Sequence, residues 1–118
     1  MLKSNEPIPL DQIPLAKLNQ SRSFLESKTE KSNTAVYGVN TGFGSLCNTV
    51  VQKDRLGELQ LNLLRSHACG TGAEVPQEIV RLMLLLKIRG LSYGYSGVSE
   101  TTFTQLVQLY NYGIIPVV

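Results

Sequence analysis

Two side chains of this sequence could do acid-base or ligand-binding chemistry beside glycine-rich backbone. Tyr37 opens the segment YGVNTGFG, and His67, the single histidine, precedes CGTG. A phenol has a pKa of about 10, so it works as a base near neutral pH only where dipoles or cations lower that value. The two segments are therefore the first places to look for chemistry.

The glycines of YGVNTGFG indicate backbone with positive φ or a close approach to another group. They also suit a lid loop, residues 37–44, that closes over a substrate and excludes water. Besides Tyr37, this loop contains Gly38, Asn40, Thr41, Gly42, Phe43 and Gly44. A tyrosine that only packs on its neighbours in a turn is the alternative, and the residues alone leave both interpretations open.

His67 lies at the end of a predicted helix, in register with Leu56, Leu59 and Leu63. This three- and four-residue spacing places it on the leucine face. It is therefore either a core residue or a ligand-binding histidine at a helix end, where the neighbouring glycines let backbone approach a substrate. Both interpretations remain open at this point.

Other chemistries lack the residues that they need. The glycine spacing GxxxGxG matches neither phosphate-binding pattern, GxxxxGK[ST] or GxGxxG. Cys47 and Cys69 lack CxxC spacing, and one histidine does not complete a zinc site, so we expect reduced thiols and no metal. No recognisable Ser-His-Asp context supports serine-type hydrolysis.

The elements that must position these residues are mainly helices. A first helix is predicted to begin at Asp11 and to fade in the polar stretch 26–33. Further helices are predicted over 53–67, 76–93 and 99–112, and a β-like run over 34–39. Pro7 and Pro9 predict an extended arm over residues 1–10. The sequence predicts a mainly α, orthogonal helical domain over 1–118. Its third helix is apolar almost all round, so we expect it to be enclosed within a larger helical protein or assembly.

Composition limits the partners. The chain has 118 residues and a formal charge of +2, and its basic residues are scattered, which argues against nucleic acid. The longest uninterrupted apolar run, residues 82–86, is far shorter than the ~20 residues of a membrane span. The N-terminus has no apolar segment typical of a signal peptide, so we expect a cytoplasmic protein without a membrane.

Taken together, VYGVNTGFGSL and LQLNLLRSHACGTG resemble the N-terminal part of the aromatic amino acid ammonia-lyases, most closely the histidine-specific members. The resemblance runs from about Thr34 to the end of the chain, through VPQEIVRLMLLLKIRGLSYGYSGV and YNYGIIPVV. It implies a part of an all-α, homotetrameric lyase that converts L-histidine to trans-urocanate and ammonia.

The resemblance also implies roles for single residues. Tyr37 corresponds to the family's catalytic base or acid. His67, 30 residues further on, corresponds to the histidine that faces the substrate ring, and Ser66-His67 favours histidine as substrate. Phenylalanine and tyrosine lyases or aminomutases of the same family, and a non-catalytic helical module that binds a partner, are the alternatives.

The family's electrophile, a methylideneimidazolone, forms from an Ala-Ser-Gly tripeptide, and no Ala-Ser-Gly occurs in these 118 residues. We therefore expect a fragment that is inactive by itself, because it has the base without the electrophile. Its missing partners would be the rest of the lyase chain and the other tetramer subunits. An exposed apolar third helix predicts that the fragment self-associates.

Overall fold

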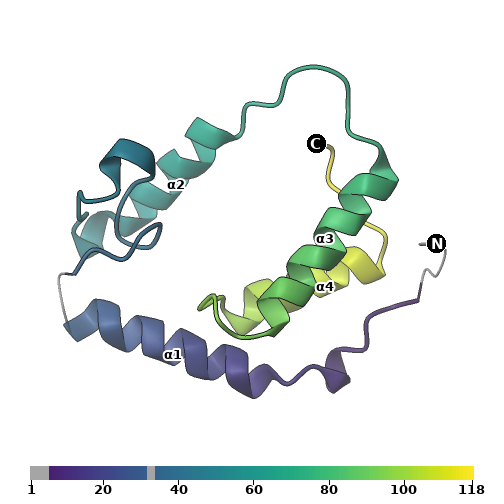
Figure 1. Ribbon diagram of the computed structural model, residues 1–118, viewed down its shortest axis with the longest axis horizontal. Coiled ribbons are helices and arrows are strands. Elements are labelled where there is room, and N and C mark those ends of the chain that lie inside the picture. The colour runs from purple at the N-terminus through teal and green to yellow at the C-terminus, as the bar shows by residue number, and fades with distance from the viewer. Residues whose placement is uncertain (1–5, 32–33) are drawn as a thin grey trace. The chain divides into compact units, whose positions relative to one another are not determined.

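The computed structural model describes residues 6–31 and 34–118, and these are mostly helical, as the sequence predicts. Residues 1–5 of the expected N-terminal arm lie outside the described part. Within these ranges, four α-helices and three short 3-10 helices occur, and Figure 1 labels the α-helices. The α-helices are α1 (Leu15–Lys31), α2 (Leu56–His67), α3 (Gln77–Ser92) and α4 (Glu100–Asn111), and the 3-10 helices are η1 (Leu10–Gln12), η2 (Gly44–Leu46) and η3 (Lys53–Arg55).

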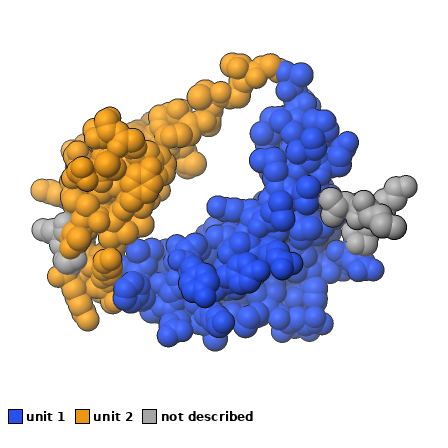
Figure 2. Space-filling view, in the orientation of Figure 1, with its two compact units in different colours: residues 1–25, 73–118 blue, residues 26–72 orange. Residues whose placement is uncertain are grey.

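The chain divides into two compact units, coloured separately in Figure 2. Unit 1 consists of residues 1–25 and 73–118, and unit 2 of residues 26–72. Helix α1 begins in the first and ends in the second. The single N-terminal domain expected over 1–118 stays a prediction, and each unit is described by itself below.

The core of unit 1 lies between α1, α3 and α4. Phe103 and Val107 of α4 are completely buried, and Leu18 of α1 and Ile88 of α3 are nearly so. Burying one such side chain stabilises the fold by about 1.5–3 kcal/mol. Helix α4 begins where Ser99 caps it by accepting a hydrogen bond from the backbone N–H of Thr102.

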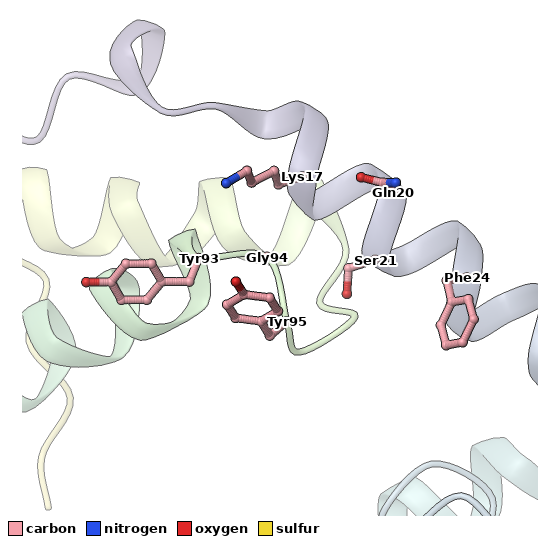
Figure 3. A pocket seen from close by; sticks show the side chains of 7 residues that line it. All are labelled: Lys17, Gln20, Ser21, Phe24, Tyr93, Gly94 and Tyr95. Carbon is pink, nitrogen blue, oxygen red and sulfur yellow. The ribbon is translucent and has the colours of Figure 1, made fainter.

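The segment after α3 packs directly on α1, within unit 1. Gly94 has φ +72°, and a Cβ there would lie 2.9 Å from the backbone carbonyl carbon of Lys17. Gly97 donates its N–H to the Ser21 hydroxyl at 3.0 Å. Between these contacts lies a cavity of about 440 Å³, walled on one side by α1 and on the other by Tyr93, Gly94 and Tyr95 (Figure 3).

Helix α3 is apolar almost all round, yet only part of its surface is covered. Val80, Ile88 and Leu91 are buried, whereas Ile79, Met83 and Leu86 remain about half exposed. The exposed three follow a helical i, i+4, i+7 spacing and form one stripe. The described residues therefore leave one face of α3 only partly covered. No helix of the described ranges is long and apolar enough to cross a membrane.

Two details differ from the sequence-based expectation. Helix α1 begins at Leu15 rather than at Asp11, whereas its end at Lys31 lies within the polar stretch 26–33 in which the sequence predicts that it fades. Glu and Lys lose little side-chain freedom in a helix, and Lys28 and Lys31 favour its C-terminal end. The β-like pairing of unit 2 is an isolated antiparallel bridge between Thr41 and Val50, so it lies just after residues 34–39 rather than within them.

Candidate active site

The loop 37–44 has the backbone that its glycines predict. Gly38 has φ +70° and Gly44 has φ +57°, values that favour glycine. A Cβ on Gly38 would lie 2.8 Å from Cε1 of Phe43, and one on Gly42 would lie 2.8 Å from Cβ of Leu46. The glycines therefore provide both positive φ and room for neighbouring side chains.

Two polar side chains hold the loop together from inside. Asn40 is buried, accepts a hydrogen bond from the Val36 N–H at 2.7 Å and donates one to the Thr34 carbonyl at 3.1 Å. The completely buried Thr41 hydroxyl donates to the Gly42 carbonyl and accepts from the Gly38 N–H. Both side chains thus stabilise the turn that carries Tyr37.

Helix α2 fastens the loop in place. The Gln60 side-chain amide donates to the carbonyls of Gly38 and Val39, at 3.5 and 3.3 Å. Gln60 lies seven residues before His67, so both project from the same side of α2. The helix therefore positions the loop and the histidine together.

Three aromatic rings form a cluster between the loop and the end of α2. The Tyr37 and Phe43 rings are tilted by 48°, with centroids 5.3 Å apart. Phe43 meets His67 edge-on, at 90° and 5.4 Å. These distances are within the range of favourable aromatic pairs. Phe43 thus contacts both Tyr37 and His67, the two residues that the sequence indicates as candidates for chemistry.

The side chain of His67 is exposed among the described residues. Its Nδ1 lies 2.8 Å from the Leu63 carbonyl oxygen and 2.9 Å from the Ser66 hydroxyl oxygen. Ser66 also donates its proton to the same Leu63 carbonyl, at 3.0 Å. The imidazole is therefore held at one nitrogen by the last turns of α2.

A cavity of about 500 Å³ lies beside this histidine, and its wall is mostly apolar. Such a volume suits a small organic ligand, with a few polar groups to orient it. The lining residues are Phe43, Gln60, Leu63, Leu64, His67 and Ala68. Tyr37 borders this site through its contact with Phe43 and is 63% exposed.

Three contributors were not selected from the sequence: Gln60, Leu64 and the Leu63 carbonyl. Helical spacing could have found Gln60 and Leu63, because they precede His67 by seven and four residues. The backbone carbonyl has no signal in the sequence.

Across the described ranges, no three His, Cys, Asp or Glu residues lie close enough together to hold a metal ion.

Comparison with known proteins places this site in a family context. A family model described as aromatic amino acid lyase matches residues 1–118. Histidine ammonia-lyase of Legionella pneumophila (strain Lens) is 46% identical over 99 residues, which are 84% of this chain and 19% of that protein. The rat enzyme of the same name (Rattus norvegicus) is 41% identical over 109 residues, 92% of this chain and 16% of that protein.

Solved structures give the same result for the fold. A tyrosine aminomutase mutant has a TM-score of 0.89 and 31% identity, over 98% of this chain and 22% of its own. Histidine ammonia-lyase from Trypanosoma cruzi has a TM-score of 0.75 and 30% identity, over 93% of this chain and 21% of its own. The chain thus spans about a fifth of the length of these proteins.

Proposed function

The chain belongs to the aromatic amino acid lyase family, and we propose that it is the N-terminal part of an enzyme that removes ammonia from L-histidine to give trans-urocanate. The observation that carries this proposal is that Tyr37 and His67 both contact the ring of Phe43. It pairs a group able to take a proton with a group able to bind an imidazole.

In the proposed reaction, Tyr37 acts as the base and takes a proton from the substrate β-carbon. The electrons of that C–H bond form the new carbon–carbon double bond, and the α-ammonium group leaves as ammonia with the electrons of the C–N bond. The β-proton is very weakly acidic, so the reacting atoms must be held in position. The loop contacts of Asn40, Thr41 and Gln60 support this role because they fix the backbone that carries Tyr37.

His67 orients the substrate ring in this proposal. Its imidazole lines the mostly apolar cavity. Ser66 contributes by holding His67. Phe43, Leu63 and Leu64 supply apolar surface for the flat faces of the ring.

The family's electrophile is a methylideneimidazolone, which would make the amine a better leaving group. The residues present do not fit that group, because none of them forms the Ala-Ser-Gly tripeptide. We therefore propose that the electrophile comes from residues other than these 118 and that this chain alone is inactive.

A second candidate is suggested by the structural neighbours, which include tyrosine aminomutases at TM-scores up to 0.89. Such an enzyme, or a phenylalanine or tyrosine lyase, would use the same base on a different ring. The experiment that separates these functions is a product assay with L-histidine, L-tyrosine and L-phenylalanine on a lyase that carries this chain. Urocanate as the main product would support the first proposal, and β-tyrosine or cinnamate-type products would overturn it.

The proposed partners follow from the exposed stripe of Ile79, Met83 and Leu86 on α3. An apolar stripe on a helix is typically covered by other protein. We propose that the rest of the lyase chain and the other subunits of a homotetramer cover it, and that the chain by itself self-associates.

A cytoplasmic location is part of the proposal, since both Cys47 and Cys69 are free thiols.

A further inference from the structure

The contact between His67 and Leu63 determines where the proton of the neutral imidazole lies. A neutral imidazole has one N–H donor and one acceptor nitrogen, and a carbonyl oxygen only accepts. Nδ1 lies 2.8 Å from the Leu63 carbonyl oxygen. Nδ1 must therefore carry the proton, which leaves Nε2 as the acceptor.

Ser66 reinforces this assignment. A hydroxyl can donate to a bare Nδ1 or accept from a protonated one, so by itself it would permit either tautomer. Here the Ser66 proton is directed to the Leu63 carbonyl, at 3.0 Å, and its lone pairs therefore face Nδ1 at 2.9 Å. The opposite tautomer would place the Nδ1 lone pair against the carbonyl oxygen, which is repulsive.

The other ring nitrogen is left for a ligand. Within the described ranges, the hydrogen bonds of the His67 ring involve Nδ1. The histidine also lines the apolar cavity with Leu63 and Leu64. An acceptor nitrogen at this position can pair with a ligand that carries a hydrogen-bond donor.

From this geometry we infer that Ser66 and the Leu63 carbonyl hold neutral His67 as the Nδ1–H tautomer, so that Nε2 accepts a hydrogen bond from the ring N–H of the substrate. Ser66 is thus a positioning residue, which acts through His67. The tautomer can be tested on a chain that has no catalytic activity. The substrate part of the inference rests on the proposed function and deepens it, because it names a ring with an N–H donor as the preferred ligand.

The tautomer can be measured directly, because His67 is the single histidine of the chain. NMR shifts of the two ring nitrogens, recorded on the 118-residue chain at a pH where the imidazole is neutral, distinguish the tautomers. We expect a protonated Nδ1 and an unprotonated Nε2. A protonated Nε2 would overturn the inference.

A Ser66→Ala variant tests the positioning role. We expect the ratio of Nδ1–H to Nε2–H tautomers to fall by roughly fivefold, the change that loss of one ordinary hydrogen bond produces in an equilibrium. Ser92→Ala is the matched control, because Ser92 makes the same bond to a carbonyl three residues earlier, at 2.7 Å, on α3. An unchanged tautomer ratio in a Ser66→Ala chain that keeps its helical circular dichroism would show that Ser66 does not position His67.

The outcomes for the inference and for the proposed function are separable. A lyase that carries this chain and does not deaminate histidine would overturn the function even if the Nδ1–H tautomer is found. A wrong tautomer in a lyase that produces urocanate would overturn the inference alone.

Discussion

The ring of Phe43 stands edge-on against the ring of His67, at 90° and with 5.4 Å between the centroids. The same phenylalanine contacts Tyr37 and lies where a side chain on Gly38 would have to go. The position of Phe43 therefore couples the loop to the end of α2. Changes that move this ring should disturb the candidate site before they unfold the chain.

Gly38→Ala tests this coupling. A Cβ at 2.8 Å from Cε1 should turn the Phe43 ring away from His67 and shift the His67 ring-proton signals in an NMR spectrum. Gly44→Ala is the matched control, since Gly44 also has positive φ but has no atom within 4 Å of the added Cβ. Equal shifts of the His67 signals in the two variants would contradict the coupling.

Gly94→Ala should destabilise unit 1 more than Gly113→Ala does. Both glycines have positive φ, so each substitution adds about 1–2 kcal/mol of backbone strain. Only at Gly94 does the new Cβ also meet backbone, that of Lys17, and this overpacking should add about 1–3 kcal/mol. Urea unfolding gives the two free energies, and equal values would show that the segment after α3 does not pack on α1 as described.

Asn40→Asp should destabilise the loop by about 1–3 kcal/mol, because the carboxylate loses the N–H donor that pairs with the Thr34 carbonyl. The substitution keeps the acceptor for the Val36 N–H, but it removes the donor and places a negative charge at a buried position beside the Thr34 carbonyl. Asn48→Asp, at an exposed position, is the control. Hydrogen exchange at the Val36 amide should become faster in Asn40→Asp and not in Asn48→Asp. Unchanged exchange in Asn40→Asp would show that Asn40 does not stabilise the loop.

The isolated 118-residue chain should produce no urocanate from histidine, and it should self-associate through the stripe on α3. Light scattering should show a molecular mass that rises with concentration. Replacing Met83 by Gln should reduce that rise, whereas Lys87→Gln, at an exposed polar position of α3, should not. A clean monomer at high concentration, or urocanate from this chain alone, would each contradict the corresponding expectation.

The helices were predictable from the sequence because their apolar residues recur at helical spacing and their ends carry recognisable residues, such as Ser99 before α4. The exact end of α1 within the polar stretch 26–33 was not, because a polar segment has no apolar period that distinguishes an exposed helix from a loop. The exposed stripe on α3 follows from apolar residues on more than one face of this helix, which the other described helices leave partly uncovered.

At the candidate site, the sequence indicated Tyr37, His67 and the need for glycine at Gly38. It could not indicate that Phe43 bridges the two, since contacts between residues 24 positions apart depend on how the chain folds back. Nor could it reveal the Leu63 carbonyl, because every residue has one and only the helix geometry brings this one to Nδ1.

The most direct test of the central claim is the rate of urocanate formation by a hybrid enzyme. This chain would replace the matching segment of the Legionella histidine ammonia-lyase, to which it is 46% identical over 99 residues. We predict that the hybrid deaminates histidine, and that Tyr37→Phe lowers kcat by about 10²–10⁴-fold. Tyr112→Phe, at an exposed tyrosine after α4, should leave kcat unchanged. A folded hybrid that forms no urocanate, or one whose kcat falls less than about tenfold in Tyr37→Phe, would contradict the assignment of Tyr37 as the base.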